Sequence, residues 1–104
     1  MDKKKYLKIL REFKKRISVE TPISKMFLFG SRVSGKEHQW SDFDLLIVSS
    51  KFNNIPSHKR GIEFYDSWSL DSPVDFLCYS PEEFNKLKNQ ITIVREAVEN
   101  GVEI

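Results

Sequence analysis

The sequence predicts an α/β (α+β) protein with a small mixed sheet of three to four strands packed against helices. Apolar runs at residues 25–30, 42–50 and 73–80 have the length and composition of buried strands. Between and around these runs, apolar residues recur at helical spacing. Because few strands are intermixed with helices, we expect a two-layer sandwich of sheet and helix.

The N-terminal segment predicts an amphipathic helix over residues 3–17, with Asp2 as its N-cap. Its apolar side chains recur at spacings of three and four and are Tyr6, Ile9, Leu10, Phe13 and Ile17. Lysine and arginine fill most of the positions between them. The basic face indicates either a solvated helix surface or an electrostatic docking surface for an acidic partner or RNA.

The next segments alternate between strand and turn. "KMFLFG" (25–30) is predicted to be a strand buried on both faces, and "SRVSG" (31–35) a brief helical turn. "KEHQW" (36–40) reads as a polar loop. "DFDLLIVSS" (42–50) is predicted to be the second strand, and the turn-rich "KFNNIPS" (51–57) follows it.

The C-terminal half continues the pattern. A helix is expected from His58 to about Leu70, weakened by Gly61, and "PVDFLCYS" (73–80) is the third strand. A helix should start at "SPEEF", with Ser80 as N-cap, Pro81 at the first helical position and Glu83 three residues after the cap. A last helix is expected over 91–100, ending at Gly101. Its buried face would carry Ile91, Val94 and Val98.

Length and composition narrow the protein class. The 104 residues fit one domain, 1–104, and 17 basic against 15 acidic residues give too small an excess to predict nucleic acid as a direct partner. Cys78 is the only cysteine, which excludes an intramolecular disulfide. No apolar run reaches the roughly 18 residues of a membrane span. We therefore expect a soluble cytoplasmic protein.

Two aspartates open the second strand. Side chains alternate along a strand, so Asp42 and Asp44 point the same way, while Phe43, Leu45 and Ile47 point into the core. Neighbouring carboxylates repel each other and are costly to bury unpaired, and a divalent cation such as Mg²⁺ removes both costs. The alternative is an exposed strand start that happens to carry two acids.

A third acid and a Gly-Ser pair strengthen the metal hypothesis. Asp75 lies within the apolar third strand, whereas the rival acids Asp66 and Asp71 fall on the expected helix and in a loop. Gly30-Ser31 ends the first strand, where glycine lets a phosphate approach the backbone and the hydroxyl adds a donor. Phosphate recognition beside two metals is the layout that phosphoryl or nucleotidyl transfer requires.

The combined motif "GSRVSG…SDFDLLIV…VDFL" resembles the nucleotidyltransferase domain of the DNA polymerase β superfamily, and specifically its minimal nucleotidyltransferase branch. The resemblance covers about residues 25–79, and the flanking helices fit it too. It implies a polymerase β-like nucleotidyltransferase fold and transfer of a nucleoside monophosphate, chiefly AMP from ATP, to an acceptor hydroxyl with release of pyrophosphate.

The resemblance also implies roles for individual residues. Gly30 and Ser31 would hold the triphosphate, Asp42 and Asp44 would bind both of two Mg²⁺ ions, and Asp75 would complete the metal that activates the attacking hydroxyl. Arg32 would either contact phosphate or cap the turn. For further residues near the motif, two roles stay open. His38 is either a ligand or a surface residue, and Arg60 either reaches the nucleotide or has a structural role. Trp40 and Trp68 either stack on a base or pack in the core or against a partner.

Relatives in the minimal branch are often paired with a small helical protein of the HEPN type as toxin and antitoxin. The resemblance therefore implies a HEPN-type partner that this protein neutralises, in some cases by attaching AMP to it; a homo-oligomer is an alternative source of the acceptor site. A binding module without catalysis, which acts by complex formation alone, is the second functional hypothesis. An antibiotic nucleotidyltransferase fits less well, because such enzymes usually have a further domain to enclose the drug.

Overall fold

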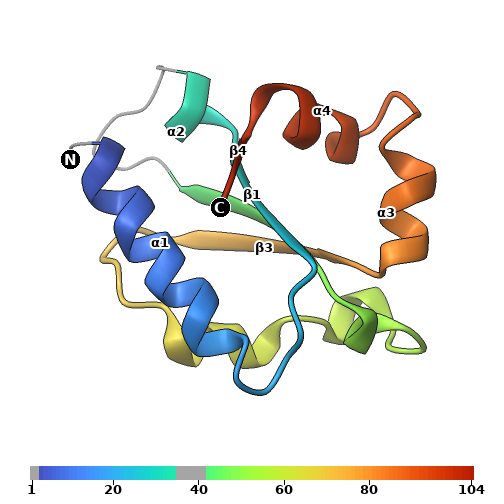
Figure 1. The fold of residues 1–104 in the computed structure, drawn as a ribbon, viewed down its shortest axis with the longest axis horizontal. Helices are drawn as coiled ribbons and strands as arrows, with labels where there is room; N and C mark the ends of the chain where they lie inside the picture. The colour runs from blue at the N-terminus through green and yellow to red at the C-terminus, as the bar shows by residue number, and fades with distance from the viewer. Residues whose placement is uncertain (1–2, 35–41) are drawn as a thin grey trace.

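A computed structural model describes residues 3–34 and 42–104 and shows a four-stranded mixed sheet with strand order β3-β2-β1-β4 (Figure 1). The strands are β1 (Lys25–Phe29), β2 (Phe43–Val48), β3 (Val74–Tyr79) and β4 (Val102–Glu103). β1 pairs antiparallel with β2 and with β4, whereas β2 and β3 are parallel. The predicted mixed sheet of three to four strands is thereby confirmed.

One face of the sheet packs on α1 (Lys3–Ile17) and on the 3-10 helix η3 (Ile62–Ser67). α1 confirms the predicted amphipathic helix, since its apolar stripe is buried while the lysines and arginines from Lys4 onward are exposed or, at Lys14, half-buried. The buried stripe consists of Tyr6, Leu10, Phe13 and Ile17. From the sheet, alternate residues of β2 complete this core: Phe43, Leu45 and Ile47.

The opposite face packs on α3 (Pro81–Leu87) and α4 (Ile93–Asn100). Its core contains Phe27 and Phe29 of β1 and Leu46 and Val48 of β2, together with Phe84, Val94 and Ala97 from the helices. Helices therefore lie on both faces of the sheet, and the expected two-layer sandwich is wrong in this detail. Two-sided burial explains why β1 and β2 are almost continuously apolar.

The segment between β2 and β3 differs from the single helix expected over 58–70. It forms two short 3-10 helices, η2 (Ser57–Lys59) and η3, separated by Gly61. Gly61 has φ of +81°, in the left-handed region that an L side chain rarely adopts, so the helical path is broken there. Another 3-10 helix, η1 (Ser50–Phe52), follows β2.

The two C-terminal helices begin at side-chain caps. Ser80 and Glu83 form the predicted capping box of α3, and Thr92 caps α4. α4 ends at Gly101 as predicted, but its buried residues are Val94 and Ala97, whereas Ile91 is 96% exposed. Val94 of the expected apolar face is thus confirmed, whereas Ile91 lies before the helix begins and Val98 is 39% exposed. The chain then adds β4, a two-residue strand that was not predicted.

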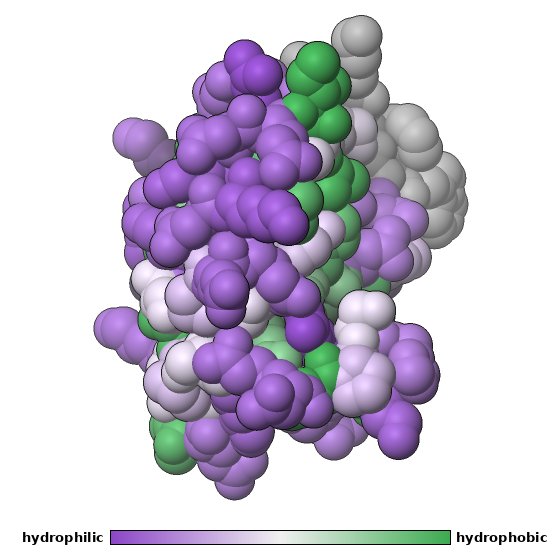
Figure 2. All heavy atoms as spheres, turned by 90° about the vertical axis from the view of Figure 1, so that its right-hand side faces the viewer, coloured by the Kyte–Doolittle hydropathy of each residue, from purple (hydrophilic) through white to green (hydrophobic). Residues whose placement is uncertain are grey.

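The surface is mainly hydrophilic on the side of the molecule at the right of Figure 1, with hydrophobic side chains interrupting it (Figure 2). Within the described ranges, no helix is long and apolar enough to cross a membrane. The predicted N-cap Asp2 and the polar loop over 36–40, with His38 and Trp40, lie outside the described residues.

Candidate active site

Three of the predicted site residues meet at one edge of the sheet. Phe29, the last residue of β1, is the register partner of Asp44 in β2, and Asp44 is in turn the partner of Asp75 in β3. Asp42 directly precedes β2 and is exposed. The backbone pairing thus brings the end of β1 and the starts of β2 and β3 together.

Strand alternation decides which face the acids share. Leu46 and Val48 of β2 lie in the core beneath α3 and α4, and Asp44 has the same parity along the strand. Asp75 shares its parity with Leu77 and Tyr79, which pack against that same core. Asp44 and Asp75 therefore belong to the α3–α4 face of the sheet, on its rim.

The electrostatics of Asp44 show that the carboxylates interact. Burial raises the pKa of Asp44 above its usual value, and the charges of Asp75 and Asp42 raise the same pKa further. All of these effects disfavour the ionised form of Asp44. A bound divalent cation would reverse that balance by supplying opposite charge to all three groups.

Gly30 lies directly against Asp44. Its φ of +83° is in the left-handed region, and a Cβ built at this position would collide with Oδ2 of Asp44. Because Gly30 has no side chain, the Asp44 carboxylate can lie directly beside the backbone turn. The chain continues into α2 (Ser31–Ser34), where the Val33 amide donates a hydrogen bond to the Gly30 carbonyl (3.0 Å).

Arg32, the third residue predicted to contact the nucleotide, is buried with 6% exposure. Its guanidinium group stacks 4.2 Å above the ring of Phe43 and donates a hydrogen bond to Oγ of Ser72 (3.0 Å). Its carbonyl accepts a hydrogen bond from the Tyr6 hydroxyl (3.0 Å). These contacts give Arg32 a packing role between α2, β2 and α1, while phosphate contact by Arg32 stays a prediction.

Other predicted candidates lie elsewhere. The Arg60 guanidinium donates hydrogen bonds to the carbonyls of Ile55 and Cys78 and to the carboxylate of Glu83, which agrees with its structural alternative. Trp68 packs edge-on against Phe13 and Phe43 in the core beneath α1. The rival acid Asp66 lies exposed on η3, and Asp71 is exposed in the loop before β3.

A cavity of about 330 Å³ adjoins the group of three aspartates, because Gly30 lines the cavity and also lies against Asp44. We call it the α2–α4 cavity, after the helices that flank it. Its lining residues are Phe29, Gly30, Val33, Glu96 and Asn100. Sequence reasoning missed Glu96 and Asn100, because nothing in the helical pattern of α4 shows that its C-terminal half returns to β1.

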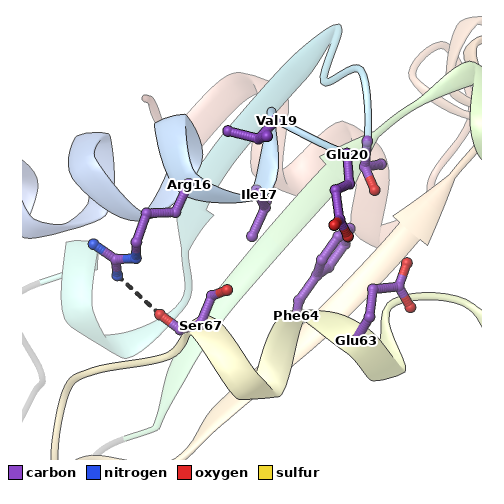
Figure 3. A pocket seen from close by; sticks show the side chains of 8 residues that line it. Arg16, Ile17, Val19, Glu20, Glu63, Phe64 and Ser67 are labelled. Atoms are coloured by element: carbon purple, nitrogen blue, oxygen red, sulfur yellow. Dashed lines mark hydrogen bonds between the residues drawn. The ribbon is translucent and has the colours of Figure 1, made fainter.

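A second cavity, of about 360 Å³, lies between the end of α1 and η3 (Figure 3). Arg16 closes one side by donating a hydrogen bond to the Ser67 carbonyl (2.8 Å). None of the predicted site residues lines it, so it is separate from the candidate active site. Its lining residues are Arg16, Ile17, Val19, Glu20, Thr21, Glu63, Phe64 and Ser67.

The fold of the chain is shared with a known structure. A solved structure from Sulfolobus solfataricus, described as that of a candidate nucleotidyltransferase, aligns with a TM-score of 0.65 over 93% of this chain and 77% of its own, at 19% sequence identity. At that identity the likeness shows a shared fold. The expected nucleotidyltransferase fold is therefore confirmed.

The sequence comparisons then give the family. The model of the nucleotidyltransferase domain family matches residues 4–100, so this chain belongs to that family. A relative from Haemophilus influenzae, named "probable protein adenylyltransferase MntA", is 31% identical over 84 residues, which are 79% of this chain and 74% of the relative. The resemblance to a minimal nucleotidyltransferase domain is thus confirmed.

Proposed function

We propose that this protein is a Mg²⁺-dependent enzyme that transfers AMP from ATP to a hydroxyl group on a partner protein. The observation that carries the proposal is the meeting of Asp42, Asp44 and Asp75 beside Gly30 in a member of the nucleotidyltransferase domain family. The name of the Haemophilus influenzae relative supports both AMP as the transferred group and a protein as the acceptor.

The donor set suits a hard divalent cation. Carboxylate oxygens are the ligands that Mg²⁺ prefers, and it usually takes only one or two of them together with water and substrate phosphates. Within the described residues, no group of three Asp, Glu, His or Cys side chains is arranged to hold a metal ion by protein atoms alone, so water and substrate phosphates would have to complete the coordination. Asp42 and Asp44 would bind both of two ions, and Asp75 one of them. The bound ions would supply Lewis acidity and neutralise charge on the phosphates.

The remaining roles belong to the protein's own groups. Gly30 lets a phosphate come close to the backbone, and Ser31 offers a hydroxyl donor beside it. The acceptor oxygen forms a bond to the α-phosphorus, the bond from that phosphorus to the bridging oxygen breaks, and pyrophosphate leaves with the electron pair. Asp75, an exposed carboxylate on the neighbouring strand, is assigned to take the proton of the acceptor hydroxyl.

The partner completes the proposal. We expect a small helical protein of the HEPN type, neutralised as the toxin of a cytoplasmic toxin–antitoxin pair when AMP is attached to it. The exposed basic face of α1 offers an electrostatic surface for such an encounter. The competing hypothesis, neutralisation by binding alone, predicts the same complex without nucleotide transfer, and the experiment below separates the two.

The test incubates the protein with Mg²⁺, candidate acceptor proteins and ATP labelled on the α- or the γ-phosphate. Label should enter a discrete protein from α-labelled ATP only, and Asp42→Asn and Asp44→Asn should each lose it. Asp66→Asn is the matched control, because Asp66 is an exposed acid on η3, outside the carboxylate group. Transfer of γ-label, or full transfer by Asp44→Asn, would refute the proposed reaction, whereas a stable complex without label would favour the binding module.

A further inference from the structure

The α2–α4 cavity has a lining that no part of the proposed reaction has used. Phe29 and Val33 provide an apolar side, and α4 provides a polar side through Glu96 and Asn100. These two residues are four apart on α4, so they stand one turn above each other. The Asn100 amide nitrogen donates a hydrogen bond to Oε2 of Glu96 (3.0 Å), and both side chains are exposed at the mouth of the cavity.

The polar groups of Glu96 and Asn100 determine which charge and hydrogen-bonding groups a ligand in the cavity should have. One of the two Asn100 amide N–H groups is committed to Glu96, which leaves the second carboxylate oxygen of Glu96 and the amide oxygen of Asn100 as hydrogen-bond acceptors and the other amide N–H as a donor. None of the described residues that line the cavity is basic. A phosphate would be repelled by Glu96, whereas a neutral group that carries hydroxyl donors would be bound.

The position of the cavity indicates which part of the reaction it serves. Gly30 lines the cavity and touches Asp44, so a ligand in the cavity adjoins the phosphate and carboxylate site. In an in-line displacement, the attacking and leaving oxygens lie on opposite sides of the α-phosphorus. The acceptor therefore approaches from the side away from the pyrophosphate held at Gly30 and Ser31, and a cavity at Gly30 does not suit the acceptor.

We propose that the α2–α4 cavity holds the ribose of the nucleoside triphosphate and that the Glu96 carboxylate accepts hydrogen bonds from its 2′- and 3′-hydroxyl groups. Glu96 is then the residue that selects ribonucleotides over deoxyribonucleotides. This inference rests on the proposed function, because it assumes that the phosphates bind at Gly30 and Ser31. The cavity volume lies within the usual range for small-ligand sites, although at its lower end.

The experiment measures the affinity of ATP, 2′-deoxy-ATP, 3′-deoxy-ATP and ITP by calorimetry in the presence of Mg²⁺. It uses the wild-type chain, Glu96→Ala and the matched control Glu99→Ala, because Glu99 is an exposed acid on α4 that pairs with Arg95 and does not line the cavity. We expect the wild type and the control to bind ATP roughly 10- to 100-fold more tightly than either deoxy analogue, as suits a hydrogen bond to a charged group. Glu96→Ala should bind ATP and both analogues with equal affinity, and more weakly than the wild type binds either analogue, because each analogue keeps one of the two hydroxyl groups.

The other outcomes overturn the inference in distinguishable ways. A preference for ATP over the deoxy analogues that survives in Glu96→Ala, or that the wild type lacks, would refute ribose recognition by Glu96 and leave the proposed reaction standing. Discrimination between ATP and ITP that disappears in Glu96→Ala would assign Glu96 to the base amine instead. Absence of any nucleotide binding by the wild type would refute the proposed function together with this inference. Thermal melting of each variant confirms that the compared chains are folded.

Discussion

Replacing Gly30 by alanine tests the most specific geometric feature of the candidate site. Alanine at a φ of +83° costs about 1–2 kcal/mol of backbone free energy. At roughly 4–8 °C per kcal/mol for a domain of this size, the melting temperature should fall by about 4–16 °C. The new Cβ also meets Oδ2 of Asp44, the mobile end of a side chain, so the carboxylate must rotate away. We expect nucleotide transfer to fall at least tenfold, beyond what the unfolded fraction explains.

Gly61→Ala is the matched control for this substitution. Gly61 has nearly the same φ, +81°, and its Cβ would meet Sγ of Cys78 instead of a carboxylate. Both variants should therefore lose stability, while only Gly30→Ala should lose transfer at a temperature where both are folded. The assays are differential scanning calorimetry and initial transfer rates with α-labelled ATP.

A double-mutant cycle separates backbone strain from the contact with Asp44. In an Asp44→Ala background, the stability cost of Gly30→Ala should shrink to the backbone part, because the colliding carboxylate is gone. The cost of Gly61→Ala should not change in that background. If Gly30→Ala retained wild-type transfer and showed no coupling to Asp44, the close approach of these residues would have no functional meaning and the reasoning would be refuted.

Three further predictions concern charge and burial. Asp44→Asn should raise the metal-free melting temperature by about 1–6 °C at neutral pH. The fold raises the pKa of Asp44, so the protein loses stability as the pH rises through that pKa, and asparagine removes this cost. A lower melting temperature would contradict this reasoning. Arg60→Lys should lower the free energy of unfolding, measured in urea, by about 2–4 kcal/mol. One ammonium group cannot replace a guanidinium that is only 9% exposed and contacts two carbonyls and Glu83. A loss under about 1 kcal/mol would show that these contacts are weak. Cys78 should react slowly with iodoacetamide at pH 8 until the chain is unfolded, since burial raises the pKa of its thiol to about 12, and equal rates in native and unfolded protein would refute that burial.

Local rules predicted the parts of the structure that short stretches of chain determine. Strand alternation separated Asp44 from Phe43, Leu45 and Ile47, and the capping box at Ser80 located the start of α3, because each depends on residues only a few positions apart. The same rules failed between β2 and β3. There, the left-handed Gly61 and the packing of Phe64 against Phe76 and Phe52 favour 3-10 turns over one helix.

Long-range contacts explain what the sequence could not predict at the site. Arg32 follows the Gly-Ser pair directly, yet its guanidinium lies on Phe43 and reaches Ser72, 40 residues away. Glu96 carries no motif, and it approaches Gly30 only because α4 packs back on β1 and its end at Gly101 closely abuts the backbone of Leu28. Sequence spacing therefore predicts which residues share a strand face, whereas the second wall of a site depends on tertiary packing.

The features at the candidate site oppose folding, and that opposition supports a functional origin. Asp44 faces Asp75 across a strand pair, where like charges are destabilising, and its carboxylate is partly desolvated as well. Gly30 adds the larger conformational entropy that glycine loses on folding. A chain selected for stability alone would replace one aspartate by a neutral side chain at no structural loss, since Asp44 and Asp75 lie on the rim of the sheet. The cost is explained if a cation binds there, because its charge offsets the repulsion between the carboxylates only while it is bound.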